Sequence, residues 1–338
     1  MLFFYRIKYI FMHILIFSIV FYPILGGIEN LTLNLSKEFV QKGHQVKVIT
    51  HQKQTELING IDVYYAPDLL KIMRLFFWCN VYYMPNISLK GVWPLLLNPR
   101  KKWIVSQNDF SLTKNKNLLS LLKLFLIKFT SKNISVSKSV ADSLRTSSEI
   151  IYNCYDDTVF TTQNFAERKY DFVFVGRLVS QKGCDNLIRA CENIQQPFRL
   201  TIVGDGPEMK QLKKLVKKLN LTAQIHFTGT LNSEKIAEIL NQHKVLVIPS
   251  ITKEGFGIVV LEGLACGCRI IAADAGGLAE AVGGFGKLYA PGDIGQLNLL
   301  LKEALQNKKP DYDQKELGAY LANYQKHIVA AKYLSAFE

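Results

Sequence analysis

Two patterns of apolar and polar positions follow each other repeatedly along this chain. Short apolar runs, such as the one within residues 244–250, have the length and composition of buried strands. Between such runs lie amphipathic stretches, for example residues 28–43, in which Leu31, Leu35 and Phe39 recur at helical spacing. Strands that alternate with helices predict parallel sheets whose two faces are both covered by helices.

The expected elements form two series along the sequence. The first half predicts a buried strand after Met12, a helix at 28–43 and further strands at 44–50, 60–67, 103–109, 133–137 and 150–153. Residues 66–100 are aromatic and irregular, and no definite element is predicted there. The second half is more regular, with strands within 171–178, 198–208, 224–231, 244–250, 268–274 and 286–293 and helices at 184–194, 209–220, 234–242 and 258–264.

This alternation predicts an α/β fold with two doubly wound, Rossmann-like domains that face each other across a cleft. We expect the first domain at residues 1–155, a polar linker at 156–169 and the second domain at 170–310. C-terminal helices at 311–338 are expected to pack back across the domains. In such sheets ligands bind beyond the carboxyl ends of the strands, so the chemistry is expected in the loops there.

The apolar N-terminus allows two interpretations. Residues 1–25 resemble a signal peptide or a membrane anchor, but Arg6 and Lys8 interrupt the apolar run and no small-residue cleavage site follows. We favour a globular first strand that begins after Met12, which leaves residues 1–11 as an extension without an assigned role.

Composition narrows the function classes. The 338 residues are 49% hydrophobic, enough for the cores of two domains, and their formal net charge of +13 favours an anionic partner such as nucleotide phosphates or an acidic membrane. A nucleic-acid binder needs a basic stripe with aromatic stacking residues, which the sequence does not offer, so no nucleic-acid partner is expected. Six cysteines without zinc-type pairing indicate reduced thiols in a cytosolic protein, with Cys266 and Cys268 as packing residues.

Residues 249–267, PSITKEGFGIVVLEGLACG, combine a strand end, a glycine-containing loop and a helix that starts near Phe256 and Gly257. The free N–H groups and the positive dipole end of such a helix suit an anion such as phosphate. Glu254 precedes the helix, and Glu262 falls about two turns into it, on the face that can look back at the loop.

Two cations lie near another helix start, in VGRLVSQKG at residues 175–183. Arg177 follows a strand and Lys182 precedes the next helix, which suits a diphosphate clamp. The alternative is a solvated loop with ordinary surface charges. Gly26 and Gly27 precede a helix at a point where the backbone must approach a ligand or turn sharply.

Taken in order, these motifs resemble glycosyltransferase family 4, the retaining glycosyl group 1 family with the GT-B fold. In the first half the resemblance rests on YPILGGIENLTLNLSKEFVQKGHQVKVIT, SVSKSVADSL and IIYNCYDDTVF. In the second half it rests on FVFVGRLVSQKGCDNLI, LTIVGDGPE, IHFTGTL and VLVIPSITKEGFGIVVLEGLACG, the last of which contains the family's E-x7-E signature. The resemblance covers nearly the whole chain.

The resemblance implies a retaining glycosyltransferase that moves a sugar from a uridine- or guanosine-diphosphate donor, bound by the second domain, to a glycan acceptor on the first. The implied catalytic residues are Arg177 and Lys182, which hold the diphosphate and stabilise the leaving group, and Glu254, which faces the sugar. Glu262 is expected to bind the ribose hydroxyls. The other implied donor contacts are Gly26, Gly27, Gly204 and the amides of Phe256, Gly257 and Ile258.

No protein nucleophile is implied, since the diphosphate itself can take the acceptor proton, and no cofactor is expected besides the nucleotide-sugar co-substrate. Three positions depart from the family pattern. Asn108 stands where many relatives have histidine, and its amide can bond a sugar hydroxyl but cannot carry charge. Cys154 replaces a glycine and Arg269 a proline. Asp311 and Asp313 resemble a metal-binding Asp-x-Asp pair, but we interpret them as helix caps and expect no metal.

Residues 114–132 combine an apolar body with five lysines. They suit a helix in an anionic membrane interface, and the alternative is a core helix of the first domain with a few exposed lysines. The membrane interpretation fits a lipid-linked acceptor in surface polysaccharide or lipopolysaccharide synthesis, with a cytoplasmic enzyme that is peripheral at the inner face of the plasma membrane. A non-catalytic nucleotide-sugar-binding subunit and a sugar-nucleotide epimerase of similar fold are the alternative functions.

Overall fold

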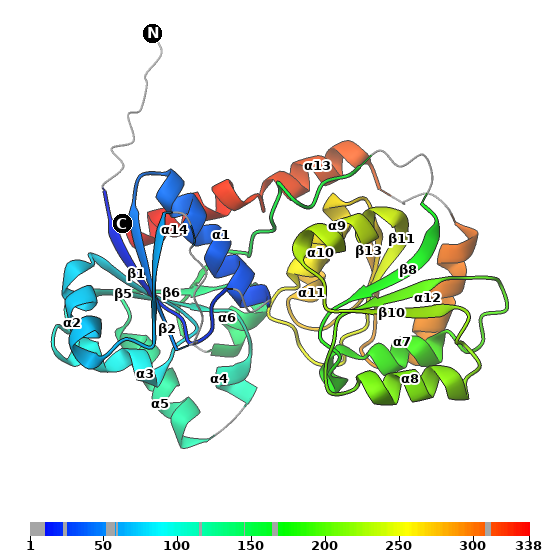
Figure 1. Cartoon of the computed structure of the whole chain (residues 1–338), viewed down its shortest axis with the longest axis horizontal. Coiled ribbons are helices and arrows are strands. Elements are labelled where there is room, and N and C mark those ends of the chain that lie inside the picture. Colours follow the sequence, from blue (N-terminus) through cyan, green and yellow to red (C-terminus); the bar gives the residue numbers. More distant parts are fainter. Residues whose placement is uncertain are drawn as a thin grey trace, which may run out of the picture. The chain divides into compact units, whose positions relative to one another are not determined.

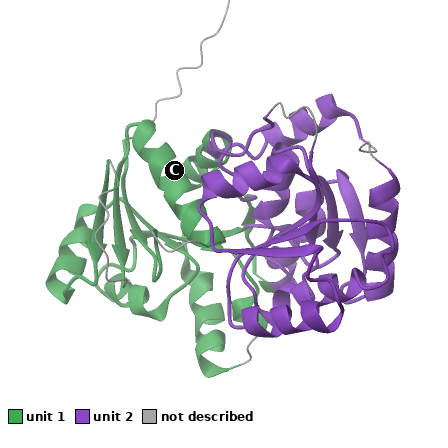
Figure 2. Cartoon of the chain, turned by 45° about the vertical axis from the view of Figure 1, so that its right-hand side comes forward, with its two compact units in different colours: residues 1–135, 144–151, 327–338 green, residues 136–143, 152–326 purple. Residues whose placement is uncertain are grey.

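The structure of the chain is a computed structural model that describes residues 11–22, 26–51, 58, 60–114, 117–144, 146–163, 168–307 and 312–338. Its contacts divide the chain into two compact units (Figure 2). Unit 1 comprises Met1–Ser135, Leu144–Ile151 and His327–Glu338, and unit 2 comprises Val136–Ser143 and Tyr152–Lys326.

The stretch in which we expected the linker forms hydrogen bonds within unit 2. Thr162 Oγ1 donates to the carbonyl oxygen of Ala265 at 2.8 Å, and the amide of Gln163 donates to Asn241 Oδ1 at 2.8 Å. Residues 164–167 of that stretch lie outside the described residues. The expected C-terminal helices are divided between the units, since α13 (Gln314–Ala322) belongs to unit 2 and α14 (Lys326–Phe337) contributes all but its first residue to unit 1.

Unit 1 is built on a seven-stranded sheet of order β3-β2-β1-β4-β5-β6-β7, in which neighbouring strands pair in parallel. The strands are β1 (His13–Phe17), β2 (Gln45–Thr50), β3 (Ile61–Tyr65), β4 (Val81–Pro85), β5 (Lys102–Gln107), β6 (Lys132–Ser135) and β7 (Glu149–Ile150). Strand β1 is buried from its second residue onward, which confirms the predicted globular first strand. Residues 1–10 lie outside the described part of the chain.

Helices cover both faces of this sheet (Figure 1). They are α1 (Gly27–Gln41), α2 (Leu69–Trp78), α3 (Leu89–Val92), α4 (Ser111–Lys114) and α5 (Leu118–Leu126), with 3-10 helices η1 (Trp93–Leu96) and η2 (Ile127–Phe129). Successive side chains of β4 point to opposite faces. Tyr82 packs on Phe76 of α2, with ring centroids 5.2 Å apart. Tyr83 packs on Tyr333 of α14 at 5.8 Å, so α2 and α14 cover different faces.

The stretch 66–100, for which no definite element was predicted, contains α2 and β4. All five residues of β4 are buried, so the strand lacks the alternation of apolar and polar positions. Helix α2 exposes Leu69, Leu70 and Phe77 to solvent, so its outer face is apolar too and the usual helical contrast is weak. Within the described residues, no helix combines the length and the apolar character needed to span a bilayer.

Unit 2 is built on a six-stranded parallel sheet of order β10-β9-β8-β11-β12-β13. Its strands are β8 (Tyr170–Val175), β9 (Leu200–Val203), β10 (Ile225–Gly229), β11 (His243–Ile248), β12 (Arg269–Ala273) and β13 (Gly286–Tyr289). Every strand and helix predicted for this half is present. The chain order reverses between β8 and β11, the point at which doubly wound sheets bind their ligands.

The helices of unit 2 follow the predicted alternation. They are α6 (Lys138–Leu144, all but its last residue), α7 (Cys184–Ala190), α8 (Met209–Lys218), α9 (Ser233–Gln242), α10 (Ile258–Ala265), α11 (Leu278–Val282), α12 (Ile294–Gln306) and α13, with the 3-10 helix η3 (Ser180–Lys182). The amphipathic pattern decides which faces pack. In α8, for example, Leu212 and Val216 are buried while the neighbouring lysines face solvent.

Candidate functional site

The loops that follow β8, β9 and β11 in unit 2 lie backbone against backbone. Gly204 has φ +132°, and a Cβ there would lie 1.9 Å from the carbonyl oxygen of Gly176. Gly183 has φ +64°, and a Cβ there would lie 2.0 Å from the carbonyl oxygen of Pro249. Only glycine allows these approaches. The sequence-predicted donor contact Gly204 is therefore a position at which two loops are held together.

Hydrogen bonds join the same loops. The amide of Leu178 donates to Asp205 O at 2.9 Å, and the amide of Ile251 donates to Gln181 O at 3.0 Å. These bonds connect the end of β8 to the ends of β9 and β11. The rim of the sheet is thus fixed before any ligand arrives, as a preorganised anion site requires.

Helix α10 begins where the sequence predicted, and its first turn is open. Its N-cap is Gly257, with φ +100° and no side-chain cap, so the helix offers the amides of its first residues, beginning at Ile258, to a ligand. The helix dipole favours an anion at this end. Phe256, which is 2% exposed, anchors the loop by stacking on Tyr152 and Tyr324 at centroid distances of 5.4 and 5.8 Å.

Glu254 is held from both its backbone and its side chain. Lys182 Nζ and Ser250 Oγ each donate to its Oε1 at 2.7 Å. Its amide donates to Ala275 O at 3.1 Å, and its carbonyl oxygen accepts from the amide of Gly277 at 2.8 Å. Two residues assigned to the leaving group and the sugar therefore form an ion pair within the site.

Glu262 lies in the second turn of α10 and is partly buried. Burial, and to a smaller extent the charge of Asp156, raise its pKa from 4.5 to about 7. Near neutral pH its carboxyl group is therefore close to half ionised. A ligand that donates hydroxyl hydrogen bonds would favour the ionised form, because a carboxylate accepts at both oxygens.

The remaining predicted residues divide between the units. Arg177 belongs to unit 2 and is exposed at the end of β8. Gly26, Gly27 and Asn108 belong to unit 1, where they follow β1 and β5. Gly26 is the N-cap of α1 with extended backbone at φ −168°, so a left-handed turn is not the reason for this glycine.

Asn108 is 6% exposed and tied into the end of β5. Its Nδ2 donates to Ser106 Oγ at 3.1 Å, and its amide donates to Asn86 Oδ1 at 2.8 Å. Its Oδ1 is buried with no hydrogen-bond partner in the structure. The side chain therefore keeps one accepting atom that its surroundings do not use.

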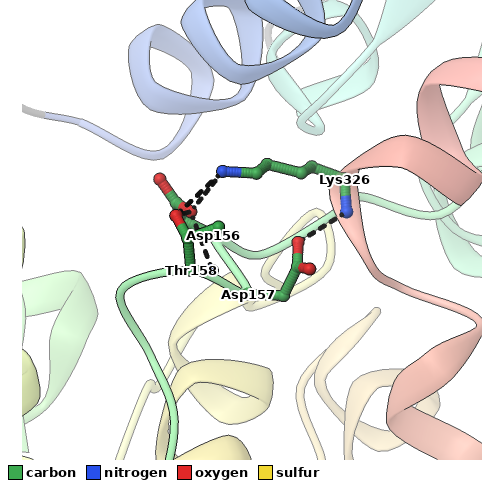
Figure 3. A network of polar contacts seen from close by, with 4 residues as sticks. All are labelled: Asp156, Asp157, Thr158 and Lys326. Atoms are coloured by element: carbon green, nitrogen blue, oxygen red, sulfur yellow. Dashed lines mark hydrogen bonds and ion pairs between the residues drawn. The ribbon is translucent and has the colours of Figure 1, made fainter.

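The sequence did not point to every residue around the site. Ser250 was not assigned, although a hydroxyl four residues before Glu254 is a recognisable signal. The ion pair of Asp156 with Lys326 (Figure 3) was missed because 170 positions separate the two residues. Asp313 caps α13 by accepting from the amides of Lys315 and Glu316, which confirms the cap interpretation.

Asp311 lies outside the described residues. Among the described residues, no group of three or more histidine, cysteine, aspartate or glutamate side chains is arranged to hold a metal ion. Cys266 and Cys268 are buried free thiols, as predicted.

The amino-acid sequence is similar to those of known proteins. Residues 156–324, half of the 338-residue chain, match the family described as glycosyl transferases group 1. The chain is 29% identical over 318 residues to an uncharacterised glycosyltransferase of Methanocaldococcus jannaschii, covering 85% of this chain and 88% of that protein. It is 25% identical over 315 residues to a subunit of phosphatidylinositol N-acetylglucosaminyltransferase of Saccharomyces cerevisiae, covering 80% and 70%.

Solved structures confirm the fold. The crystal structure of Anabaena HepE in complex with UDP matches with a TM-score of 0.79 and 19% identity, over 96% of this chain and 99% of that chain. Such neighbours are GT-B glycosyltransferases, and the two parallel, doubly wound sheets agree with that fold. Glu254 and Glu262, the signature pair, fall inside the matched family segment. The chain therefore belongs to the glycosyl transferases group 1 family and is a nucleotide-sugar-dependent glycosyltransferase.

Proposed function

We propose that this enzyme transfers a sugar, with retention of configuration, from a uridine- or guanosine-diphosphate donor to a lipid-linked glycan. The observation that carries the donor half is the loop rim of unit 2, where Lys182, Glu254 and the uncapped start of α10 come together. The relative whose name includes phosphatidylinositol, and the neighbour that holds UDP, support a lipid-linked acceptor and a nucleotide donor.

In the proposed step, the bond between the sugar C1 and the diphosphate oxygen breaks, and its electron pair moves to that oxygen. Arg177, Lys182 and the first amides of α10 stabilise the charge that develops there. The acceptor oxygen bonds to C1 on the same face and passes its proton to the departing phosphate. Lys182 has three N–H donors, so it can keep its bond to Glu254 and still bind a phosphate oxygen.

Glu262 is proposed to bind the donor ribose, and its removal tests this. Glu262→Gln should lower the affinity for UDP or GDP by at least tenfold at pH 8, because a neutral amide replaces a charged acceptor of two hydroxyl bonds. Calorimetric titration measures this, and Glu238→Gln, on the exposed face of α9, is the matched control. Unchanged affinity in Glu262→Gln would refute the ribose role. Nucleotide binding without any transfer would favour the non-catalytic subunit instead.

The proposal of a lipid-linked acceptor is supported by an exposed apolar surface of unit 1. Leu118, Leu121 and Phe125 of α5 are 81%, 54% and 54% exposed, so α5 is not a core helix. Other exposed apolar side chains lie on η1, η2 and the outer side of α2: Leu69, Leu70, Phe77, Leu96 and Phe129. We call these side chains of α2, η1, α5 and η2 the apolar face.

The elements of the apolar face cover the same side of the sheet. Tyr82 of β4 contacts both α2 and α3, which continues into η1. The crossovers from β4 to β5 and from β5 to β6 continue in the same direction across the sheet, so right-handed connections place α5 on that side as well (Figure 1).

The segment that contains the apolar face carries most of the chain's excess charge. Residues 69–135, all of them in unit 1, contain eleven lysines and arginines and a single acid, Asp109, a net +10 of the chain's +13. Exposed leucines and phenylalanines among an excess of cations suit the interface of an anionic membrane, where apolar burial and electrostatic attraction add. We infer that unit 1 docks there to reach its acceptor.

Vesicle sedimentation tests this docking. Lys123→Glu/Lys128→Glu should weaken binding to anionic vesicles by at least about 1 kcal/mol for each lysine. Lys214→Glu/Lys217→Glu, on the exposed face of α8 in unit 2, makes the same change of net charge and should have a much smaller effect. Equal losses in the two double variants would show that overall charge, not the apolar face, governs binding.

A further inference from the structure

Glu254 uses its two carboxylate oxygens unequally. Oε1 accepts two hydrogen bonds, from Lys182 Nζ and from Ser250 Oγ, each at 2.7 Å. Among the described residues, none donates a hydrogen bond to Oε2. The Glu254 side chain is 19% exposed, and Oε2 is not one of the buried polar atoms without a partner. Oε2 is therefore accessible and is the oxygen with which Glu254 can accept a hydrogen bond from a ligand.

Ser250 is the more rigid of the two groups that hold Oε1. It is completely buried just after β11, and its side chain is short. The backbone on each side of it is fixed. The carbonyl oxygen of Pro249 lies 2.0 Å from the Cβ position of Gly183, and the amide of Ile251 donates to Gln181 O at 3.0 Å. The loops that follow β8 and β11 therefore determine where the Ser250 hydroxyl lies.

Lys182 is less suited to hold Oε1 alone. Its side chain is long and 34% exposed, so solvent screens its ion pair with Glu254 in part. The same ammonium group is also proposed to bind the diphosphate, so its position depends on the nucleotide sugar. The hydrogen bond from Ser250 is the one that holds Oε1 in the same way whether or not a nucleotide is bound.

The backbone of Glu254 is placed by other contacts. Its amide donates to Ala275 O at 3.1 Å, and its carbonyl oxygen accepts from the amide of Gly277 at 2.8 Å. Gly276 has φ +68°, and a Cβ there would lie 2.7 Å from the same carbonyl oxygen. Loss of the Ser250 hydroxyl should therefore free the carboxylate group to turn while the loop around Glu254 stays in place.

We propose that Ser250 is a positioning residue for sugar transfer: it fixes Oε1 of Glu254, so that Oε2 accepts a hydrogen bond from a hydroxyl group of the nucleotide sugar. This inference rests on the proposed role of Glu254 toward the sugar. Because Ser250 is completely buried, it does not touch the nucleotide sugar and acts through Glu254. A carboxylate oxygen accepts but does not donate, so the site selects sugars that keep a hydroxyl at the position that meets Oε2.

Ser250→Ala tests this role, because it removes the hydroxyl and adds no atoms. The kcat for transfer from uridine- or guanosine-linked sugars to extracted lipid-linked glycans should fall by about tenfold to a hundredfold, since a carboxylate that is free to turn is only part of the time in the productive orientation. The affinity for UDP or GDP, measured by calorimetry, should stay within about twofold, because neither nucleotide carries the sugar.

Ser36→Ala is the matched control. Ser36 of α1 is also completely buried, and its hydroxyl donates to Thr32 O at 2.7 Å. Removing it should leave both kcat and nucleotide affinity unchanged. Two results for Ser250→Ala would overturn the proposal: a native kcat, or a fall in transfer that is matched by an equal fall in UDP or GDP affinity, because the second result indicates a general disturbance of the site.

Deoxy forms of the nucleotide sugar, each lacking one sugar hydroxyl, test the chemistry directly. In the native protein, the form that lacks the hydroxyl bound by Oε2 should lose at least about tenfold in kcat/KM. In Ser250→Ala this penalty should shrink to about twofold, because the carboxylate is no longer held for that hydroxyl. A penalty that is equally large in both proteins would mean that Ser250 does not act through Glu254.

Glu254→Ala distinguishes the two levels of failure. If it transfers sugar as fast as the native protein, the role of Glu254 toward the sugar fails, and the inference about Ser250 fails with it. If Glu254→Ala loses transfer while Ser250→Ala keeps the native kcat, the role of Glu254 stands and the positioning role of Ser250 is wrong.

Discussion

At the scale of single residues, the ionised form of Glu262 lowers the stability of the fold, although the same form is proposed to bind the nucleotide. Its pKa rises from 4.5 to about 7 on folding, so between these values the folded protein holds a proton that the unfolded chain releases. Stability from this group is therefore highest at low pH and falls as the pH rises toward 7. Glu262→Gln removes the buried charge and should raise the free energy of unfolding at pH 8 by up to about 3 kcal/mol.

Denaturant unfolding of the ligand-free protein at pH 5 and pH 8 checks this gain, which should shrink strongly at pH 5. Glu238→Gln, whose side chain is exposed, should change stability little at either pH. A Glu262→Gln variant that is less stable than the native protein at pH 8 would contradict the buried charge. The same variant should bind nucleotide poorly, so its gain in stability comes with a loss of function.

Arg177 and Lys182 carry a second prediction at this scale. Arg177 is exposed at the rim and Lys182 bonds only one oxygen of Glu254, so both can meet a diphosphate. Because two cations and the α10 amides already oppose the leaving-group charge, we expect transfer to continue in excess chelator. Product formation with and without EDTA measures this, and a rate that collapses and returns with manganese would contradict the assignment.

At the scale of elements, the loops around the donor site depend on glycines that let backbones touch. Gly204→Ala should be more destabilising than Gly292→Ala by on the order of 2 kcal/mol. Both glycines have positive φ, but only at Gly204 would the added Cβ lie 1.9 Å from a carbonyl oxygen, that of Gly176. Gly292 has open space around its Cβ position and isolates the backbone penalty. Thermal unfolding compares the stability of the two variants. Equal losses of stability would mean that the loops around Gly204 move apart at little cost to accept the added methyl group.

The same scale shows what the sequence could predict. The second half was assigned well because helices such as α8 have one apolar stripe and strands such as β9 are followed by a glycine. Strand β4 was missed because it is buried on both faces, and helix α2 was missed because leucines lie on its exposed face. In both elements the difference between apolar and polar positions, on which a periodic pattern depends, is lost. For 114–132 the pattern left core and membrane helix equally open, and only exposure decided against the core.

The site was predictable in part for a similar reason. One short segment contains Glu254, Gly257 and Glu262, so the local sequence was enough to predict a loop and the start of a helix. The bond of Lys182 to Glu254 crosses 72 positions, and that of Lys326 to Asp156 crosses 170. Neither pairing has a local signal, because each forms only when distant parts of the chain come together in the folded structure.

At the scale of the whole molecule, the two units carry different surfaces. Unit 2 contains Arg177, Lys182, Glu254 and Glu262, and unit 1 contains the basic segment 69–135 with its apolar face. This division agrees with an enzyme whose donor is small and soluble and whose acceptor is lipid-linked. Because part of the proposed membrane attraction is electrostatic, raising the salt concentration should weaken binding to vesicles and leave transfer to a soluble acceptor largely intact.

The most direct test of the central claim is a transfer assay read by mass spectrometry, with uridine- and guanosine-linked sugars offered against extracted lipid-linked glycans. The account predicts that one glycan gains the mass of one sugar while an equal amount of nucleoside diphosphate is released, and that Glu262→Gln abolishes both. Release of nucleoside diphosphate without a gain in glycan mass, or transfer that Glu262→Gln leaves unchanged, would contradict it.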